Sequence, residues 1–151
     1  MADPITEAAR KSLDRSLSDM RTAIVDATAD QLGRRPGGED TNPIVVIVVH
    51  ALHSTRSWLS IATGAPVPER DRPAEFRATT EGADDLLRFL DRFGDECRDL
   101  LAGVDSIDHG ATWQAPDGEI VTRAWALIHA LEHLREHVAQ AMLTRQMASE
   151  R

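Results

Sequence analysis

Residues 42–64 of the sequence, NPIVVIVVHALHSTRSWLSIATG, decide the fold. β-branched residues fill the whole of 44–49, so β-propensity alone would predict a strand there. Three features favour a helix instead. Asn42 followed by Pro43 is typical of a helix start, Gly64 is typical of a helix end, and the span between them is much longer than a strand. Its first half is apolar on every side, which is typical of a helix at the centre of a protein.

Three amphipathic stretches accompany this central helix. They run from about residue 4 to 32, from about 79 to 103 and from about 122 to 147. Because no alternating strand pattern competes with them, we expect an all-α fold. Four long helices in one chain are typical of an up-and-down bundle. The connections after the second and third helices, 65–79 and 104–120, are long enough to be functional or mobile.

Length and composition restrict the class of protein. The 151 residues predict one domain, 1–151, and 42% hydrophobic and 28% charged residues are ordinary for a soluble protein. A net charge of −8 argues against nucleic-acid partners and against an anionic membrane surface. A single cysteine excludes an intrachain disulfide and a multi-cysteine metal site. We see no signal peptide and no unbroken apolar run long enough to span a bilayer, so we expect a cytoplasmic protein.

Histidines on the last predicted helix carry the functional signal. His129, His133 and His137 follow one another at steps of four, and two imidazoles at that spacing can bind one metal ion. His129 and His137 are about 12 Å apart along the helix axis, too far to share an ion. The pair is therefore either of the two that contain His133. His137 lies about 70° from the centre of the apolar stripe, His133 about 110° and His129 about 150°, which favours His133 with His137.

A third ligand should come from another helix that faces the core. His50 is the natural candidate, because it follows six apolar residues and an unpaired imidazole is costly in such a place. His53 lies one turn later in a more polar stretch. Spacing alone leaves two interpretations open. These histidines either bind a metal ion or are ordinary surface and core residues.

Other residues suggest weaker hypotheses. Cys97 falls at helical spacing with apolar neighbours, so we expect a core thiol rather than a nucleophile. Trp58 lies two turns beyond His50 and could line an access route. Arg70, Arg72 and Arg77 are either a solvated loop or a group that holds the carboxylate of a ligand. In the second case, replacing all three together should weaken ligand affinity and leave the metal content intact.

Three segments carry a family resemblance. They are the Asn-Pro start with Trp58 eight residues after His50, the sequence RDRPAEF at 70–76, and HLREHVAQ at 133–140. The last is similar to an H-x3-H-x2-Q element. In their order and spacing, over roughly residues 13–145, they resemble the DinB/YfiT-like family of metalloenzymes.

The resemblance implies a fold and a metal site. The fold is a four-helix up-down-down-up bundle, and we expect a homodimer. The site holds a divalent ion, zinc or nickel, between one histidine of the second helix and two residues four apart on the fourth. Carried over to this sequence, the ligands are His50, His133 and His137, with the register fixed by Gln140. This is the pair that the helical phase favours.

The resemblance also implies a class of reaction. Relatives include thiol-dependent S-transferases and a mycothiol-dependent maleylpyruvate isomerase. In the isomerase branch a glutamate stands where this chain has His133, so isomerase activity does not carry over. We expect a metal-dependent S-transferase that uses a low-molecular-weight thiol such as mycothiol and a small-molecule electrophile. The alternatives are a metal-water hydrolase and a non-enzymatic, dimeric helical binding module with a vestigial metal site.

Overall fold

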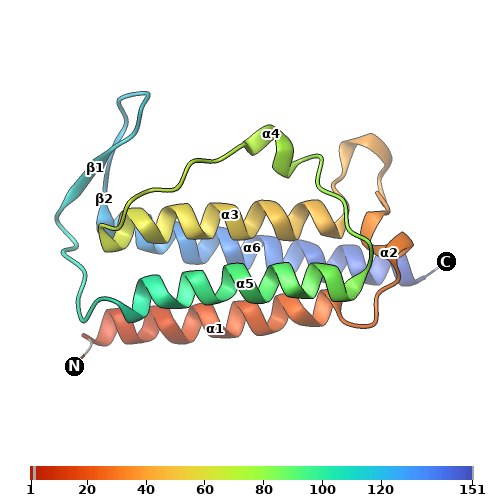
Figure 1. Ribbon diagram of the computed structural model, residues 1–151, viewed down its shortest axis with the longest axis horizontal. Helices are drawn as coiled ribbons and strands as arrows, with labels where there is room; N and C mark the ends of the chain where they lie inside the picture. The colour runs from red at the N-terminus through yellow and green to blue at the C-terminus, as the bar shows by residue number, and fades with distance from the viewer. Residues whose placement is uncertain (2, 151) are drawn as a thin grey trace.

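The computed structural model describes residues 1 and 3–150 and is predominantly helical, as the sequence predicts (Figure 1). Four long helices lie side by side: α1 (Pro4–Ile24), α3 (Ile44–Thr63), α5 (Ala83–Ala102) and α6 (Arg123–Ser149). α3 packs against α5 and α6, and α1 packs mainly against the same two helices. In Figure 1, α1 and α6 run from left to right, and α3 and α5 run from right to left.

The central helix α3 forms where the sequence predicts it, with a different start. Its N-cap residue is Pro43, and no side chain forms a capping hydrogen bond at this end of the helix. Asn42 therefore does not have the expected capping role. Gly64 ends the helix at φ 77°, a conformation that glycine adopts without a Cβ clash. Burial of both faces of 44–48 overrides the local β-propensity.

One segment is long and apolar enough to cross a membrane by length and composition, Gly38–Thr63, with a mean hydropathy of 1.4. Of its most apolar window, 78% is buried inside the structure. That is the pattern of the core helix of a soluble protein. The expectation that no segment spans a bilayer therefore depends on burial, because composition alone does not exclude it.

The first helix is shorter than predicted. It ends at Ile24, Asp26 adopts φ 59°, and a separate short helix, α2, covers Ala29–Gly33. A capping box starts α2: the Thr28 side chain accepts from the backbone N–H of Gln31, whose side chain accepts from the backbone N–H of Thr28. The predicted single helix 4–32 is therefore wrong beyond residue 24. A 3-10 turn, Gly38–Asp40, follows before α3.

The two long connections contain short elements that were not predicted. Residues 65–79, called the strap below, cross the outer side of α3 and include α4 (Arg72–Glu75) (Figure 1). The connection before α6 includes an antiparallel hairpin of β1 (Thr112–Gln114) and β2 (Ile120–Thr122). The expectation of no strands is therefore wrong for these short segments.

Two helix boundaries test the sequence signals further. α5 starts at Ala83 rather than near residue 79, because Thr80 donates to the Asp85 carboxylate and forms a turn ahead of the helix. α6 starts after Thr122, close to the predicted start, and the Thr122 hydroxyl caps it by accepting from the backbone N–H of Trp125 at 3.1 Å.

Candidate metal centre

Three imidazole rings from two helices meet between α3 and α6. His50 comes from α3, and His133 and His137 come from successive turns of α6. One ligand nitrogen of each lies within 4.8 Å of those of the other two. The Nε2 atoms of His133 and His137 are 3.2 Å apart, and the ring centroid of His50 is 5.4 Å from that of His133 and 5.1 Å from that of His137. The fold thus brings together the three histidines that the sequence singles out, called the histidine trio below.

A buried carboxylate from the strap orients His50. Nδ1 of His50 lies 2.9 Å from Oε2 of Glu75, and both side chains are buried. An ionised carboxylate only accepts hydrogen bonds, so Nδ1 carries the proton and Nε2 keeps its lone pair. Arg70 in turn donates to both oxygens of Glu75, from Nε at 2.8 Å and from a terminal nitrogen at 2.7 Å. This fixes the tautomer of a ligand imidazole in the way common at metal sites.

An amide does the same for His137. Oε1 of Gln140 lies 2.8 Å from Nδ1 of His137 and accepts a hydrogen bond from its N–H, which leaves the lone pair on Nε2. The Nε2 atoms of His137 and His133 are 3.2 Å apart. Because Nε2 of His137 carries no proton in this arrangement, Nε2 of His133 must carry one for the two to form a hydrogen bond. Nδ1 of His133 is buried and has no hydrogen-bond partner within the described part of the chain. His133 is therefore the least satisfied ring of the trio.

The surroundings keep two of these rings, His50 and His133, neutral. Burial, with repulsion from the His137 and His50 rings, lowers the pKa of His133 to about 4. Burial also lowers the pKa of His50, although the hydrogen bond to Glu75 opposes the change. Burial alone would raise the pKa of Glu75, but hydrogen bonds from Arg70 and His50 hold it below its ordinary value. At neutral pH His50 and His133 are thus neutral, and an ionised carboxylate lies behind His50.

The trio fits a divalent metal ion. Imidazole nitrogens bind zinc at about 2.0–2.1 Å, so two Nε2 atoms 3.2 Å apart can both reach one ion. The ligand nitrogens of the three rings lie within 4.8 Å of one another, a limit slightly greater than the length of two zinc–nitrogen bonds. A small side-chain rotation therefore lets all three rings bind one ion. Because each ring supplies one nitrogen, three protein ligands leave a coordination position open, as in catalytic rather than structural zinc sites.

The other histidines stay outside the trio. His129 stacks on Trp125 and contacts His133 only through ring edges, with centroids 5.5 Å apart. His53 packs against Phe93, with centroids 4.6 Å apart, and its buried Nδ1 has no hydrogen-bond partner among the described residues.

Glu75 is the residue that the sequence did not single out. It falls inside the RDRPAEF segment at 70–76, but its role depends on the strap returning across α3 to His50. The same contact corrects the interpretation of the loop arginines. Arg70 is bound to Glu75 through Nε and one terminal nitrogen, so it is not a solvated loop residue, whereas Arg72 and Arg77 are exposed.

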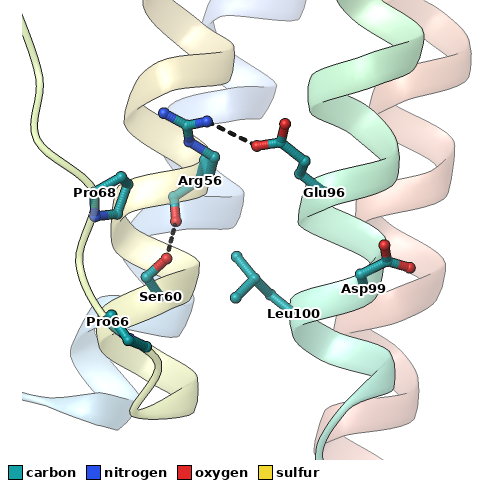
Figure 2. A pocket seen from close by; sticks show the side chains of 7 residues that line it. All are labelled: Arg56, Ser60, Pro66, Pro68, Glu96, Asp99 and Leu100. Atoms are coloured by element: carbon teal, nitrogen blue, oxygen red, sulfur yellow. Dashed lines mark hydrogen bonds and ion pairs between the residues drawn. The ribbon is translucent and has the colours of Figure 1, made fainter.

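Cys97 and a groove beside α3 are not part of this site. Burial raises the pKa of the Cys97 thiol to about 12, so it is a core thiol, as predicted. The groove, of about 400 Å³, lies between α3, the strap and α5, and none of the three histidines lines it (Figure 2). Two of its charged groups pair with each other, since Arg56 donates to Glu96 at 2.7 Å.

Comparison with known proteins places the chain in a family. The sequence model of the DinB superfamily matches residues 12–141. A solved structure described as the conserved protein of locus from Enterococcus faecalis has a TM-score of 0.78 and 14% identity to the chain. The match covers 99% of this chain and 100% of that one, and at this identity it shows the fold alone. No curated protein matches. Because the family model spans most of the sequence, the chain belongs to the DinB superfamily, as its resemblance predicts.

Proposed function

We propose that the chain is a metal-dependent enzyme in which His50, His133 and His137 bind a divalent ion, zinc or nickel. We assign it as a thiol S-transferase that joins a mycothiol-like thiol to a small-molecule electrophile. The observation that carries the proposal is the convergence of three imidazoles within 4.8 Å, with two of them oriented by Glu75 and Gln140. Membership of a metal-binding helical superfamily supports it.

The chain's own residues prepare this centre. Glu75 and Gln140 hold the Nδ1 protons of His50 and His137, so that both Nε2 atoms present lone pairs toward His133. Arg70 balances the charge of Glu75, so the chain places no uncompensated negative charge behind His50. An anionic thiolate therefore meets no repulsion from that side. When bound, the ion supplies Lewis-acid chemistry that lowers the pKa of a thiol or of water.

The test combines metal analysis with a transfer assay. The full chain is purified without a metal-affinity step, its metal content is measured, and mycothiol, cysteine and coenzyme A are assayed with monobromobimane as electrophile. We expect about one zinc or nickel per chain and thiol turnover that is lost in His133→Ala. Metal-dependent ester hydrolysis without thiol turnover would favour the hydrolase, and bound metal with neither activity would favour the binding module.

The remaining expectations belong to the same proposal. The directions of the four long helices support an up-down-down-up bundle in a single domain. We assign the protein to the cytoplasm, as a homodimer whose partners are small molecules rather than nucleic acid or membrane. Light scattering after size-exclusion chromatography tests the dimer directly.

A further inference from the structure

Three rings from two helices form a continuous aromatic surface beside the histidine trio. Trp125 and His129, one turn apart on α6, stack with centroids 4.6 Å apart and planes at 13°. Trp58 of α3 meets both rings edge-on, at 5.2 Å from Trp125 and 4.9 Å from His129. We call Trp58, Trp125 and His129 the aromatic wall.

The aromatic wall touches the metal centre. The centroid of His129 lies 5.5 Å from that of His133, which belongs to the trio. Glu132 contacts His129 at the ring edge, 3.3 Å from Nδ1, and so steadies the ring without covering its face. A molecule whose reacting atom lies at the trio would therefore extend along this wall.

One ring of the wall, Trp125, is exposed to solvent, while Trp58 and His129 are half-buried. The Trp125 side chain is 45% exposed, although burying a tryptophan is among the larger apolar gains available to a fold. Arginine side chains stack on Phe93 and Phe76 elsewhere, but among the described residues none lies over Trp58 or Trp125. A ligand can therefore reach the exposed part of Trp125, and uncovered aromatic surface beside a polar centre is typical of binding sites.

We infer that the aromatic wall binds the planar, uncharged aromatic group of the electrophilic substrate and directs its reacting carbon toward the histidine trio. The assignment of this molecule as the electrophile rests on the proposed function. Recognition by stacking does not, because neither a metal ion nor a thiol takes part in it. Flat aromatic rings gain from stacking with offset or edge contacts, whereas saturated rings of similar size gain only from apolar burial.

The three tryptophans make a direct test possible. In the ¹⁵N-labelled full chain, the indole N–H signals of Trp58, Trp113 and Trp125 are followed by NMR during titration with 4-nitroanisole, an unreactive planar probe. We expect the signals of Trp58 and Trp125 to shift and that of Trp113 to stay. Methoxycyclohexane, a saturated probe of similar size, should bind at least fivefold more weakly. Trp125→Leu keeps an apolar side chain and should raise the Kd of the planar probe about fivefold.

A neighbouring residue supplies the matched control. Ile128 is 63% exposed on the same helix and lies outside the aromatic wall, so Ile128→Ala should leave the Kd unchanged. Equal binding of the two probes, equal loss in both variants, or shifts confined to Trp113 would overturn the inference. So would closure of the wall by a second copy, seen as concentration-dependent shifts of Trp125 without probe. Failure of the proposed function would appear separately, as absent metal or absent thiol turnover with probe binding intact.

Discussion

Oε2 of Glu75 lies 2.9 Å from Nδ1 of His50, although the two residues are 25 positions apart and belong to different elements. The contact joins the strap to the central helix at the point where the histidine trio forms. Because Arg70 holds the same carboxylate with two hydrogen bonds, the strap sets both the charge and the orientation behind His50.

Removing the charge of Glu75 should weaken metal binding without removing a ligand. Glu75→Gln can still occupy the space and accept from Nδ1 of His50, but it loses the negative charge that strengthens this hydrogen bond and one of the two oxygens that Arg70 binds, so we expect zinc affinity to fall about tenfold or more. Competition with a chromophoric chelator measures this. Glu69→Gln, an exposed position in the same strap, is the control. Equal affinities for the two variants would show that Glu75 does not support the site.

The ligand set predicts a hierarchy among the histidines of α6. His133→Ala and His137→Ala should each abolish stoichiometric zinc binding, because each removes one of the two nitrogens that lie 3.2 Å apart. His129→Ala should keep full metal content, since His129 contacts the trio only through ring packing. Metal content after dialysis measures all three variants. Loss of metal in His129→Ala with retention in His137→Ala would place the site one turn earlier.

The depressed pKa of His133 predicts how the metal-free protein loses stability in acid. In the unfolded chain a histidine takes up a proton near pH 6.5, whereas His133 in the folded chain does so only near pH 4. The unfolded state therefore binds more protons between these values, and the free energy of unfolding falls as the pH falls through that window. The lowered pKa of His50 acts in the same direction.

Urea unfolding at pH 7 and pH 5, with chelator present, tests this. Glu75 adds little to the change in unfolding free energy between pH 7 and pH 5, because its lowered pKa keeps it ionised in the folded state. We expect a smaller drop in the unfolding midpoint for His133→Gln than for the unchanged chain. An identical drop in both would mean that His133 is not the group that resists protonation.

Local signals predicted the helices, and they failed where a short motif interrupts a long periodicity. Apolar spacing continues from α1 toward Leu32, so the stripe predicts one helix, but the capping box at Thr28 and Gln31 starts a new one. The strands β1 and β2 are each three residues long, too short for alternation to be recognised.

Sequence patterns predicted the site residues that lie on helices but not the one that the strap brings to them from a distance. Helical phase on α6 favours His133 with His137, and the apolar run before His50 indicates an inward imidazole. Glu75 could not be found by such reasoning, because a charged residue in a proline-containing loop is normally solvent-exposed. Its burial follows only from the path of the strap across α3.

Cys97 should be chemically silent in the native protein. Burial raises the pKa of its thiol to about 12, so the thiolate that reacts with disulfide reagents is scarce at pH 8, and the side chain is covered. We expect little reaction with Ellman's reagent over an hour in buffer and one thiol per chain in guanidinium. Rapid reaction of the native protein would contradict the packing around α5.

The loop arginines should separate into two classes when they are replaced one at a time. Arg70 binds both oxygens of Glu75, and a lysine cannot reproduce that two-pronged contact, so Arg70→Lys should lower zinc affinity together with Glu75→Gln. Arg72 lies over Phe76 at 5.8 Å and Arg77 is exposed, so the pair Arg72→Lys and Arg77→Lys should leave zinc affinity unchanged. In a double-mutant cycle, Arg70→Lys should add little to the effect of Glu75→Gln on zinc affinity, because the two side chains act through one contact.

The contrary outcome is an equal fall in zinc affinity in Arg70→Lys and in the double variant of Arg72 and Arg77. It would show that the total charge of the loop supports the centre, rather than the contact of Arg70 with Glu75.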